Sequence, residues 1–325
     1  MRITLSFIIL TIVLALLITN CAEGDHDPSI TVFEITKTID HIPGNDESFF
    51  EMPQGATYHN GYVYTADISA NKIIRMRSDF KTGNVIGKQG RAPGEFLGPT
   101  FVRATDEGVY VTEEGNNRLQ IFDSQFTYRN LIYTRITLGQ TFGVSSHNTL
   151  LLQSWSPDIL VREFNEHGDT VRSFGTPIHT KPHLNNIMIE TDESDNVYVA
   201  FVGTPVIRKY DFQRELVWET DLSPLIEEME STIIGDSDGL RFTTLAFGIY
   251  KEYLYVYLRG HSSDEFGGIR VHMINCVNGH LSGEIIIKID ILRSLFGGFS
   301  FAPDGTLYFA DLGNAEIVKA RSVVR

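Results

Sequence analysis

Hydrophobic and polar residues alternate in short segments along most of the chain, and one such segment recurs six times. Each copy is a polar turn followed by an alternating run, as in residues 106–113 (DEGVYVTE). Alternation with a period of two predicts strands, and the Asn-Gly and Asp-Gly turns are typical of hairpins because both residue types tolerate positive φ. The other copies lie at 60–67, 147–153, 195–201, 251–258 and 303–311.

Each copy has the same neighbours, so the repeating unit is larger than one hairpin. A short apolar strand precedes the turn, and a third strand and a polar turn follow, leading to a fourth strand such as residues 170–174. The copies end 40 to 57 residues apart, which is the period of a four-stranded propeller blade. We therefore predict an all-β fold, a six-bladed β-propeller over residues 30–325. The predicted third strands are 72–76, 118–122, 161–164, 206–210, 269–274 and 316–320.

The two ends of the chain predict how this ring closes. Residues 30–39 alternate like a strand, whereas the last repeat runs out after its third strand. We expect the N-terminal strand to supply the missing fourth strand, which removes a free sheet edge. Two stretches do not fit strands: residues 223–229 predict a helix with Ser223 as N-cap, and residues 290–296 predict a helical turn.

The copies resemble NHL repeats, most closely in the second repeat. There, residues 94–99 (GEFLGP) precede the first strand and residues 117–122 (NRLQIF) form the third. Repeats one and six keep part of this pattern, and repeats three to five lose its Asn-Arg element. Together with residues 86–96 (IGKQGRAPGEF), the repeats make the chain similar to the six-bladed propeller lipoproteins of Bacteroidetes and related bacteria. That resemblance implies the fold but no activity, because these proteins are mostly of unknown activity.

The first 21 residues predict export to a bacterial envelope. Arg2 is the only charge in the first 20 positions, and residues 3–18 are almost all apolar. Residues 17–21 (LITNC) resemble a lipobox, although Asn20 departs from its usual Gly, Ala or Ser. We therefore predict a signal peptide over 1–20, lipidation of Cys21, a polar tether over 21–29 and anchoring at the outer membrane. Simple secretion and an uncleaved anchor are the alternatives.

Composition narrows the possible partners. Lys and Arg number 27 against 41 Asp and Glu, a net charge of -14, which argues against nucleic-acid binding. Once Cys21 is lipidated, Cys276 is the other cysteine, and its apolar neighbours predict burial. The chain lacks the sequence motifs of serine hydrolases, zinc proteases and phosphate-binding loops. We expect a monomer that binds a protein, peptide or glycan and contacts the membrane through its lipid.

The candidate ligand-binding face follows from propeller geometry. The loops leading into the innermost strands and those after the second strands share one face. Trp155 is the strongest candidate there because exposed Trp is enriched at binding hot spots, and folding back onto its own blade is the alternative. Asp67, Asn71, Asn117 and Asp311 occupy positions that hold turns. The full candidate set is Arg91, Glu95, Glu113, Glu114, Trp155, His183, Arg259 and Asp311.

Two function classes remain open. The first is a non-catalytic binding module, which we prefer, with no catalytic residue, metal ligand or cofactor. The second is a metal-dependent hydrolase, lactonase or lyase, implied by related six-bladed propellers that hold Ca²⁺ or Zn²⁺. The residues expected near the inner-strand starts form a neutral ring, which suits a hard cation poorly. They are Gln54, Thr100, Thr141, Asn185, Thr244 and Ser300.

Overall fold

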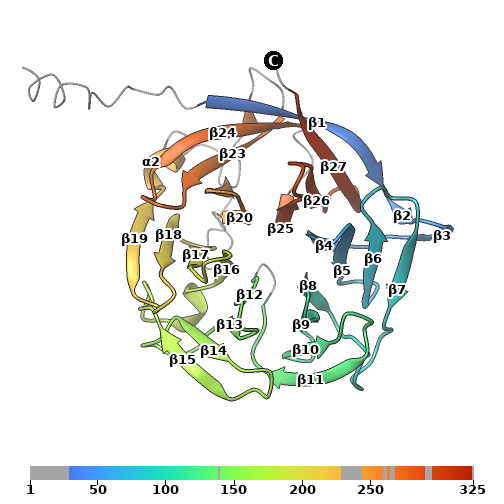
Figure 1. The fold of residues 1–325 in the computed structure, drawn as a ribbon, viewed down its shortest axis with the longest axis horizontal. Coiled ribbons are helices and arrows are strands. Elements are labelled where there is room, and N and C mark those ends of the chain that lie inside the picture. The colour runs from blue at the N-terminus through green and yellow to red at the C-terminus, as the bar shows by residue number, and fades with distance from the viewer. Residues whose placement is uncertain are drawn as a thin grey trace, which may run out of the picture.

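The chain forms β-sheets arranged around a central axis (Figure 1). The computed structural model describes residues 29–137, 140–227, 244–258, 262–263, 268–289 and 295–323. The predicted signal peptide, Cys21, the tether up to residue 28 and Arg259 lie outside these ranges. Within them, no helix is both long and apolar enough to span a bilayer.

Four separate sheets of four antiparallel strands follow one another around the axis, each beginning with its innermost strand (Figure 1). The predicted second and third strands are confirmed in all four. The first sheet contains β4 (Pro53–His59), β5 (Tyr62–Asp67), β6 (Lys72–Arg77) and β7 (Gly83–Ile86). The second contains β8 (Pro99–Ala104), β9 (Val109–Glu113), β10 (Arg118–Phe122) and β11 (Tyr128–Tyr133). The third contains β12 (Gly143–Val144), β13 (Leu150–Gln153), β14 (Val161–Phe164) and β15 (Thr170–Phe174), and the fourth β16 (Ile187–Thr191), β17 (Val197–Phe201), β18 (Val206–Tyr210) and β19 (Leu216–Asp221).

The last two repeats share one nine-stranded sheet with the N-terminal strand, where the sequence predicted two separate blades. Parallel pairs join the two repeats at both edges, β20 to β25 on the inside and β24 to β1 on the outside. The molecule is therefore propeller-like, with four blades and this closed unit. The strands of the unit are β1 (Ser29–Ile39), β20 (Thr244–Tyr250), β21 (Tyr253–Leu258), β22 (Ser262–Ser263), β23 (Gly268–Asn275), β24 (Leu281–Lys288), β25 (Leu295–Phe301), β26 (Leu307–Asp311) and β27 (Glu316–Val323).

Glycine explains why the innermost strands approach so closely here. Gly297 and Gly298 of β25 lie opposite Ala246 and Phe247 of β20. On the other side of β25, a Cβ added to Gly55 of β4 would lie 2.9 Å from the Gly298 nitrogen. A side chain at these positions would push the backbones apart.

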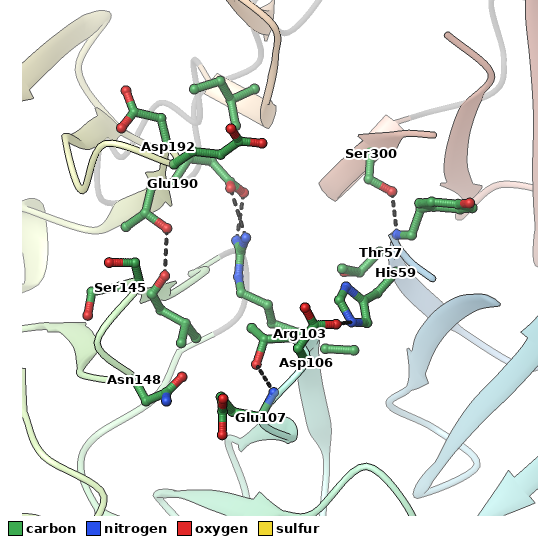
Figure 2. A pocket seen from close by; sticks show the side chains of 18 of the residues that line it. Thr57, His59, Arg103, Asp106, Glu107, Ser145, Asn148, Glu190, Asp192 and Ser300 are labelled. Carbon is green, nitrogen blue, oxygen red and sulfur yellow. Dashed lines mark hydrogen bonds and ion pairs between the residues drawn. The ribbon is translucent and has the colours of Figure 1, made fainter. Parts of the chain in front are cut away.

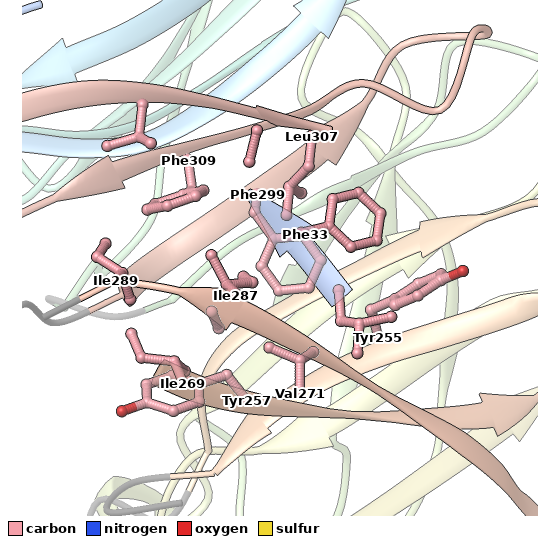
Figure 3. Close-up of a cluster of buried hydrophobic side chains, with 14 residues drawn as sticks. Phe33, Tyr255, Tyr257, Ile269, Val271, Ile287, Ile289, Phe299, Leu307 and Phe309 are labelled. Carbon is pink, nitrogen blue, oxygen red and sulfur yellow. The ribbon is translucent and has the colours of Figure 1, made fainter. Parts of the chain in front are cut away.

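The N-terminal strand closes the ring as the sequence predicts. β1 pairs antiparallel with β27, with Val32 opposite Val323 and Ile39 opposite Ile317. Its first half also pairs in parallel with β24, which the sequence did not indicate. Phe33 inserts into a core formed by side chains from both repeats, including Ile287 and Phe299 (Figure 3).

The remaining elements are short. Helix α2 (Ser223–Glu227) has Ser223 as its first residue, where the sequence predicted the N-cap just before the helix, and the backbone N–H of Ser223 is accepted by Asp221 at 2.8 Å. Residues 228–229 of the predicted helix lie outside the described ranges. The hairpin β2 (His41–Ile42) and β3 (Asn45–Phe49) precedes the first sheet. The helical turn predicted over 290–296 is wrong at its end, because β25 begins at Leu295; its first five residues lie outside the described ranges. Cys276 is buried as predicted, and this burial raises its pKa to about 11, which disfavours the reactive thiolate at neutral pH.

Candidate functional site

Three of the four residues expected to hold turns do so through their side chains. The Asp67 carboxylate accepts three backbone N–H groups at 2.9, 3.0 and 3.1 Å. The Asn71 side-chain oxygen accepts the backbone N–H of Gly98 at 2.9 Å, and Asp311 accepts that of Gly313 at 3.0 Å. Asn117 adopts the left-handed region with φ 47°, which suits a turn.

Glu113 is a structural carboxylate, fully buried between the second sheet and the loop before it. One oxygen accepts Nε of Arg118 and the side-chain amide of Gln120, each at 2.7 Å. The other accepts the backbone N–H of Leu97 at 2.9 Å and the side-chain amide of Asn116 at 2.7 Å. With four donors bound, this carboxylate has no lone pair directed at a ligand.

Other members of the predicted set are more open. Arg91, Glu114 and His183 are exposed, and His183 lies in the 3-10 helix η1 (Pro182–Leu184). Glu95 accepts the backbone N–H of Ala92 at 3.1 Å and pairs with Lys88 at 3.3 Å. The hydrogen bond from Ala92, and to a smaller extent the contact with Lys88, holds the pKa of Glu95 below its usual range.

Trp155 is half-buried and folded against the connection between the second and third sheets. Its indole N–H donates to the carbonyl of Arg135 at 3.0 Å. The Arg135 guanidinium lies 4.2 Å from the centre of the ring, covering one face of it. The structure thus shows an anchored Trp155, and its role in ligand contact stays a prediction.

A hollow among the described residues lies at the opposite end of the inner strands (Figure 2). Its volume is ≈ 630 Å³, and its walls come from the C-terminal ends of β4, β8, β16 and β25 and the turns that follow β8, β12 and β16. A hollow of ≈ 750 Å³ continues from it and shares seven of its residues. We call these two volumes together the channel cavity. Their shared residues are Tyr58, His59, Thr191, Asp192, Glu193, Ile249 and Phe301.

A buried ion pair crosses the channel cavity. Arg103 of β8 donates to both carboxylate oxygens of Glu190 of β16, at 2.9 and 2.7 Å (Figure 2). Nε of Arg103 donates to the Phe142 carbonyl at 3.1 Å, and the rings of Phe101 and Phe142 lie 5.5 and 6.0 Å from the guanidinium. The pair ties the second, third and fourth sheets together. The sequence signal for this ion pair is a charged residue, Arg103 or Glu190, on an otherwise apolar inner strand. The candidate set derived from the sequence includes neither residue.

Hydroxyl groups tie adjacent inner strands to one another around the cavity. Ser300 donates to the Ala56 carbonyl at 2.9 Å and accepts the backbone N–H of Tyr58 at 2.6 Å. Thr57 of β4 donates to the Val102 carbonyl of β8 at 2.7 Å. Ser300 was expected near the start of its inner strand. It lies near the end instead, because β25 already begins at Leu295.

The rest of the expected neutral ring does not suit a hard cation. All the polar atoms of the Asn185 amide are used by its own loop, and the Thr141 hydroxyl is bonded to Ile189 of β16. Gln54 Nε2 and Thr244 Oγ1 are buried without a hydrogen-bond partner among the residues that the structure describes, but neither carries charge. Among the described residues, no three His, Cys, Asp or Glu side chains are grouped to hold a metal ion.

Ser146, His147 and Asp195 lie together but lack the arrangement of a catalytic triad. Nδ1 of His147 contacts both the Ser146 hydroxyl at 3.1 Å and the Asp195 carboxylate at 2.9 Å. A triad needs one ring nitrogen for each partner. Burial raises the pKa of Asp195, but hydrogen bonds from Ser146 and His147 outweigh it and hold the pKa below its usual range.

Comparison with known proteins supports the fold. No family model and no curated protein matches the chain. An inactive variant of virginiamycin B lyase from Staphylococcus aureus, solved with quinupristin, aligns with TM-score 0.52 and 16% identity over 86% of this chain and 83% of that one. A protein described as exported from Bacteroides fragilis aligns with TM-score 0.56 and 10% identity, over 87% and 88%. A chain of the mitotic checkpoint complex aligns with TM-score 0.56 and 10% identity, over 91% and 93%. At these identities the likeness shows a propeller-like fold and nothing of function.

Proposed function

We propose that the chain is a six-bladed propeller built from NHL-like repeats. The nine-stranded sheet contains two antiparallel sets of four strands, β20-β21-β23-β24 and β25-β26-β27-β1. Each set runs outward from an innermost strand, as the four separate sheets do. The parallel pairs between the sets are then contacts between neighbouring blades.

We further propose that the protein is a binding module whose ligand occupies the channel cavity. The observation that carries this proposal is the hollow of ≈ 630 Å³, a volume typical of pockets for small molecules or for one or two residues of a longer ligand. The Arg103–Glu190 pair forms a rigid, neutral element across it. A peptide, a glycan end or a protein side chain would enter from the face that carries the turns after the inner strands.

Catalysis is the alternative, as a metal-dependent hydrolase, lactonase or lyase. The aligned lyase supports the fold alone, and the neutral ring around Gln54 and Thr244 lacks the charged oxygen ligands that Ca²⁺ prefers. One stoichiometric metal ion in the purified protein would favour the catalytic alternative.

A cavity-blocking substitution tests the proposed site. Ser146 is exposed and lines the cavity, so Ser146→Trp should fill its mouth. The matched control is Glu114→Trp, an exposed position on the face predicted from the sequence. In a thermal-shift screen of amino acids, short peptides and oligosaccharides, a ligand at about 100 times its Kd should stabilise the wild type by about 2.7 kcal/mol.

We expect Glu114→Trp to keep this thermal shift and Ser146→Trp to lose it. A ligand with the reverse behaviour would place the binding site on the face that carries Arg91, Glu95 and Trp155.

We also propose an envelope lipoprotein attached through Cys21. The sequence of the first 21 residues supports this, and the aligned Bacteroides protein is described as exported. Cys21→Ser should abolish lipid labelling and move the protein from the membrane fraction to the soluble fraction, because several acyl chains are needed for firm attachment. Membrane retention of this variant would indicate an uncleaved anchor.

A further inference from the structure

The channel cavity has an unequal set of charges. Five carboxylates line it, and they belong to Asp106, Glu107, Glu190, Asp192 and Glu193. The basic side chains along the same walls are Arg103, Lys251 and His59. The charges that are not already in ion pairs determine which kind of ligand the cavity can bind.

Two of the three basic groups are paired with carboxylates, and the third contacts an aromatic ring. Arg103 is held by Glu190, and the ammonium group of Lys251 lies 5.2 Å from the centre of the Tyr250 ring. Nε2 of His59 contacts Asp106 at 3.2 Å. An anionic ligand would have to displace a carboxylate from Arg103 or His59, and Lys251 at the exposed rim is the remaining basic group among the described lining residues.

Two carboxylates, in contrast, are available. Asp192 accepts two backbone N–H groups and the Tyr198 hydroxyl, so its oxygens are used by its own turn. Glu107 and Glu193 are exposed, and their carboxylates make no hydrogen bond or ion pair with any residue that the structure describes. Set against the single ammonium of Lys251, these two carboxylates leave the unpaired charge of the described lining net negative.

The other wall of the cavity is apolar and aromatic. The Phe301 ring stacks on Tyr250 at 4.8 Å and contacts Tyr255 at 4.7 Å, while Tyr58 stacks on Tyr308 at 5.8 Å. Because these ring faces already pack against each other, they form a wall for aliphatic groups more readily than open platforms for sugar rings.

The chain's own basic groups show how this environment holds a cation. The Arg103 guanidinium combines a carboxylate with two neighbouring phenyl rings, and Lys251 places its ammonium over a tyrosine ring at the rim. Both arrangements pair a positive nitrogen with the groups that line the cavity.

We propose that the channel cavity binds an organic cation with primary amine or guanidinium groups, each charge paired with Glu107 or Glu193 and the methylene groups against Phe301 and Tyr58. Lysine or arginine side chains of a peptide and free polyamines share this chemistry. The proposal rests on the proposed function, since it assigns a ligand class to the same cavity.

Calorimetric titration of the mature protein with two cations tests the assignment. Spermidine represents a free polyamine, and acetyl-Lys-Lys-Lys-amide represents a basic peptide; acetyl-Gln-Gln-Gln-amide is the neutral control. The double variant Glu107→Gln/Glu193→Gln removes both free charges. Its matched control is Glu51→Gln/Glu215→Gln, which changes the net charge equally at exposed positions outside the cavity.

We expect at least one cation to bind the wild type, with about tenfold weaker affinity in the Glu107/Glu193 variant and an unchanged Kd in the control. Raising NaCl from about 20 to about 200 mM should weaken binding because these carboxylates are exposed to solvent. Spermidine binding alone would identify a polyamine, and peptide binding alone a basic peptide.

Three results would overturn the assignment: equal binding of the neutral peptide, equal affinity of the two double variants, or no binding of either cation. A neutral or anionic ligand that is lost in Ser146→Trp would also overturn it while supporting the cavity as the binding site.

Discussion

Deleting residues 29–40 is expected to abolish cooperative folding. This segment contains β1, whose backbone pairs with β27 on one side and β24 on the other. Its loss would expose two strand edges and remove Phe33 from the core shared by the last two repeats. Proteins of this kind have about 5–15 kcal/mol of stability in total, so the loss of a double ladder and a core aromatic exceeds what the fold tolerates. Circular dichroism during heating and urea titration would show a broad transition or none.

A single-residue version of this experiment separates packing from chain length. Phe33→Ala should lower the free energy of unfolding by about 3–5 kcal/mol, because the ring is buried among side chains of both repeats. Glu34→Ala is the control, since that side chain is exposed and makes one surface ion pair with Lys288. A truncated protein that melts at the same temperature as the intact one would show that β1 does not close the ring.

Replacing Glu113 with Ala is expected to lower the free energy of unfolding by about 3–5 kcal/mol, because the Arg118 guanidinium would remain buried without its counter-ion. The backbone N–H of Leu97 and the amides of Asn116 and Gln120 would also lose their acceptor. Urea unfolding followed by fluorescence measures the difference.

The neighbouring Glu114→Ala is the matched control, since its side chain is exposed and should change stability little. Equal losses in the two variants would contradict a structural role for Glu113. If only Glu113→Ala is destabilised, this residue leaves the candidate ligand-binding set.

Local pattern was sufficient to predict the strands. Turn residues and period-two alternation act within about ten residues, so the second and third strands of all six repeats lie where the sequence places them. The start of α2 was predictable to within one residue, because helix starts depend on adjacent residues, although Ser223 is the first helical residue and not the N-cap. The pairing of β1 with β27 was also predictable. The last repeat lacks its fourth strand, and the N-terminal segment is a strand that belongs to no other repeat, so the second can complete the first.

The candidate site depended on contacts that alternation does not encode. The sequence placed Glu113 and Trp155 on a loop face. In the structure, Arg118 pairs with the Glu113 carboxylate, and Arg135 covers one face of the Trp155 indole. The merging of the last two repeats depends on the parallel pairing of β20 with β25 and of β1 with β24, which joins segments that no local pattern relates.

The sequence by itself determined the all-β class, the repeat period, most strand positions and the closing strand, because these follow from interactions between near neighbours and from counting strands. Only the tertiary structure decided which face is hollow and which charges remain unpaired. Arg103 and Glu190 are 87 residues apart, and the sequence around either residue does not indicate that the two form an ion pair. Burial and pairing are properties of the assembled sheets, so the channel cavity and its two free carboxylates emerge only when the inner strands meet around the axis.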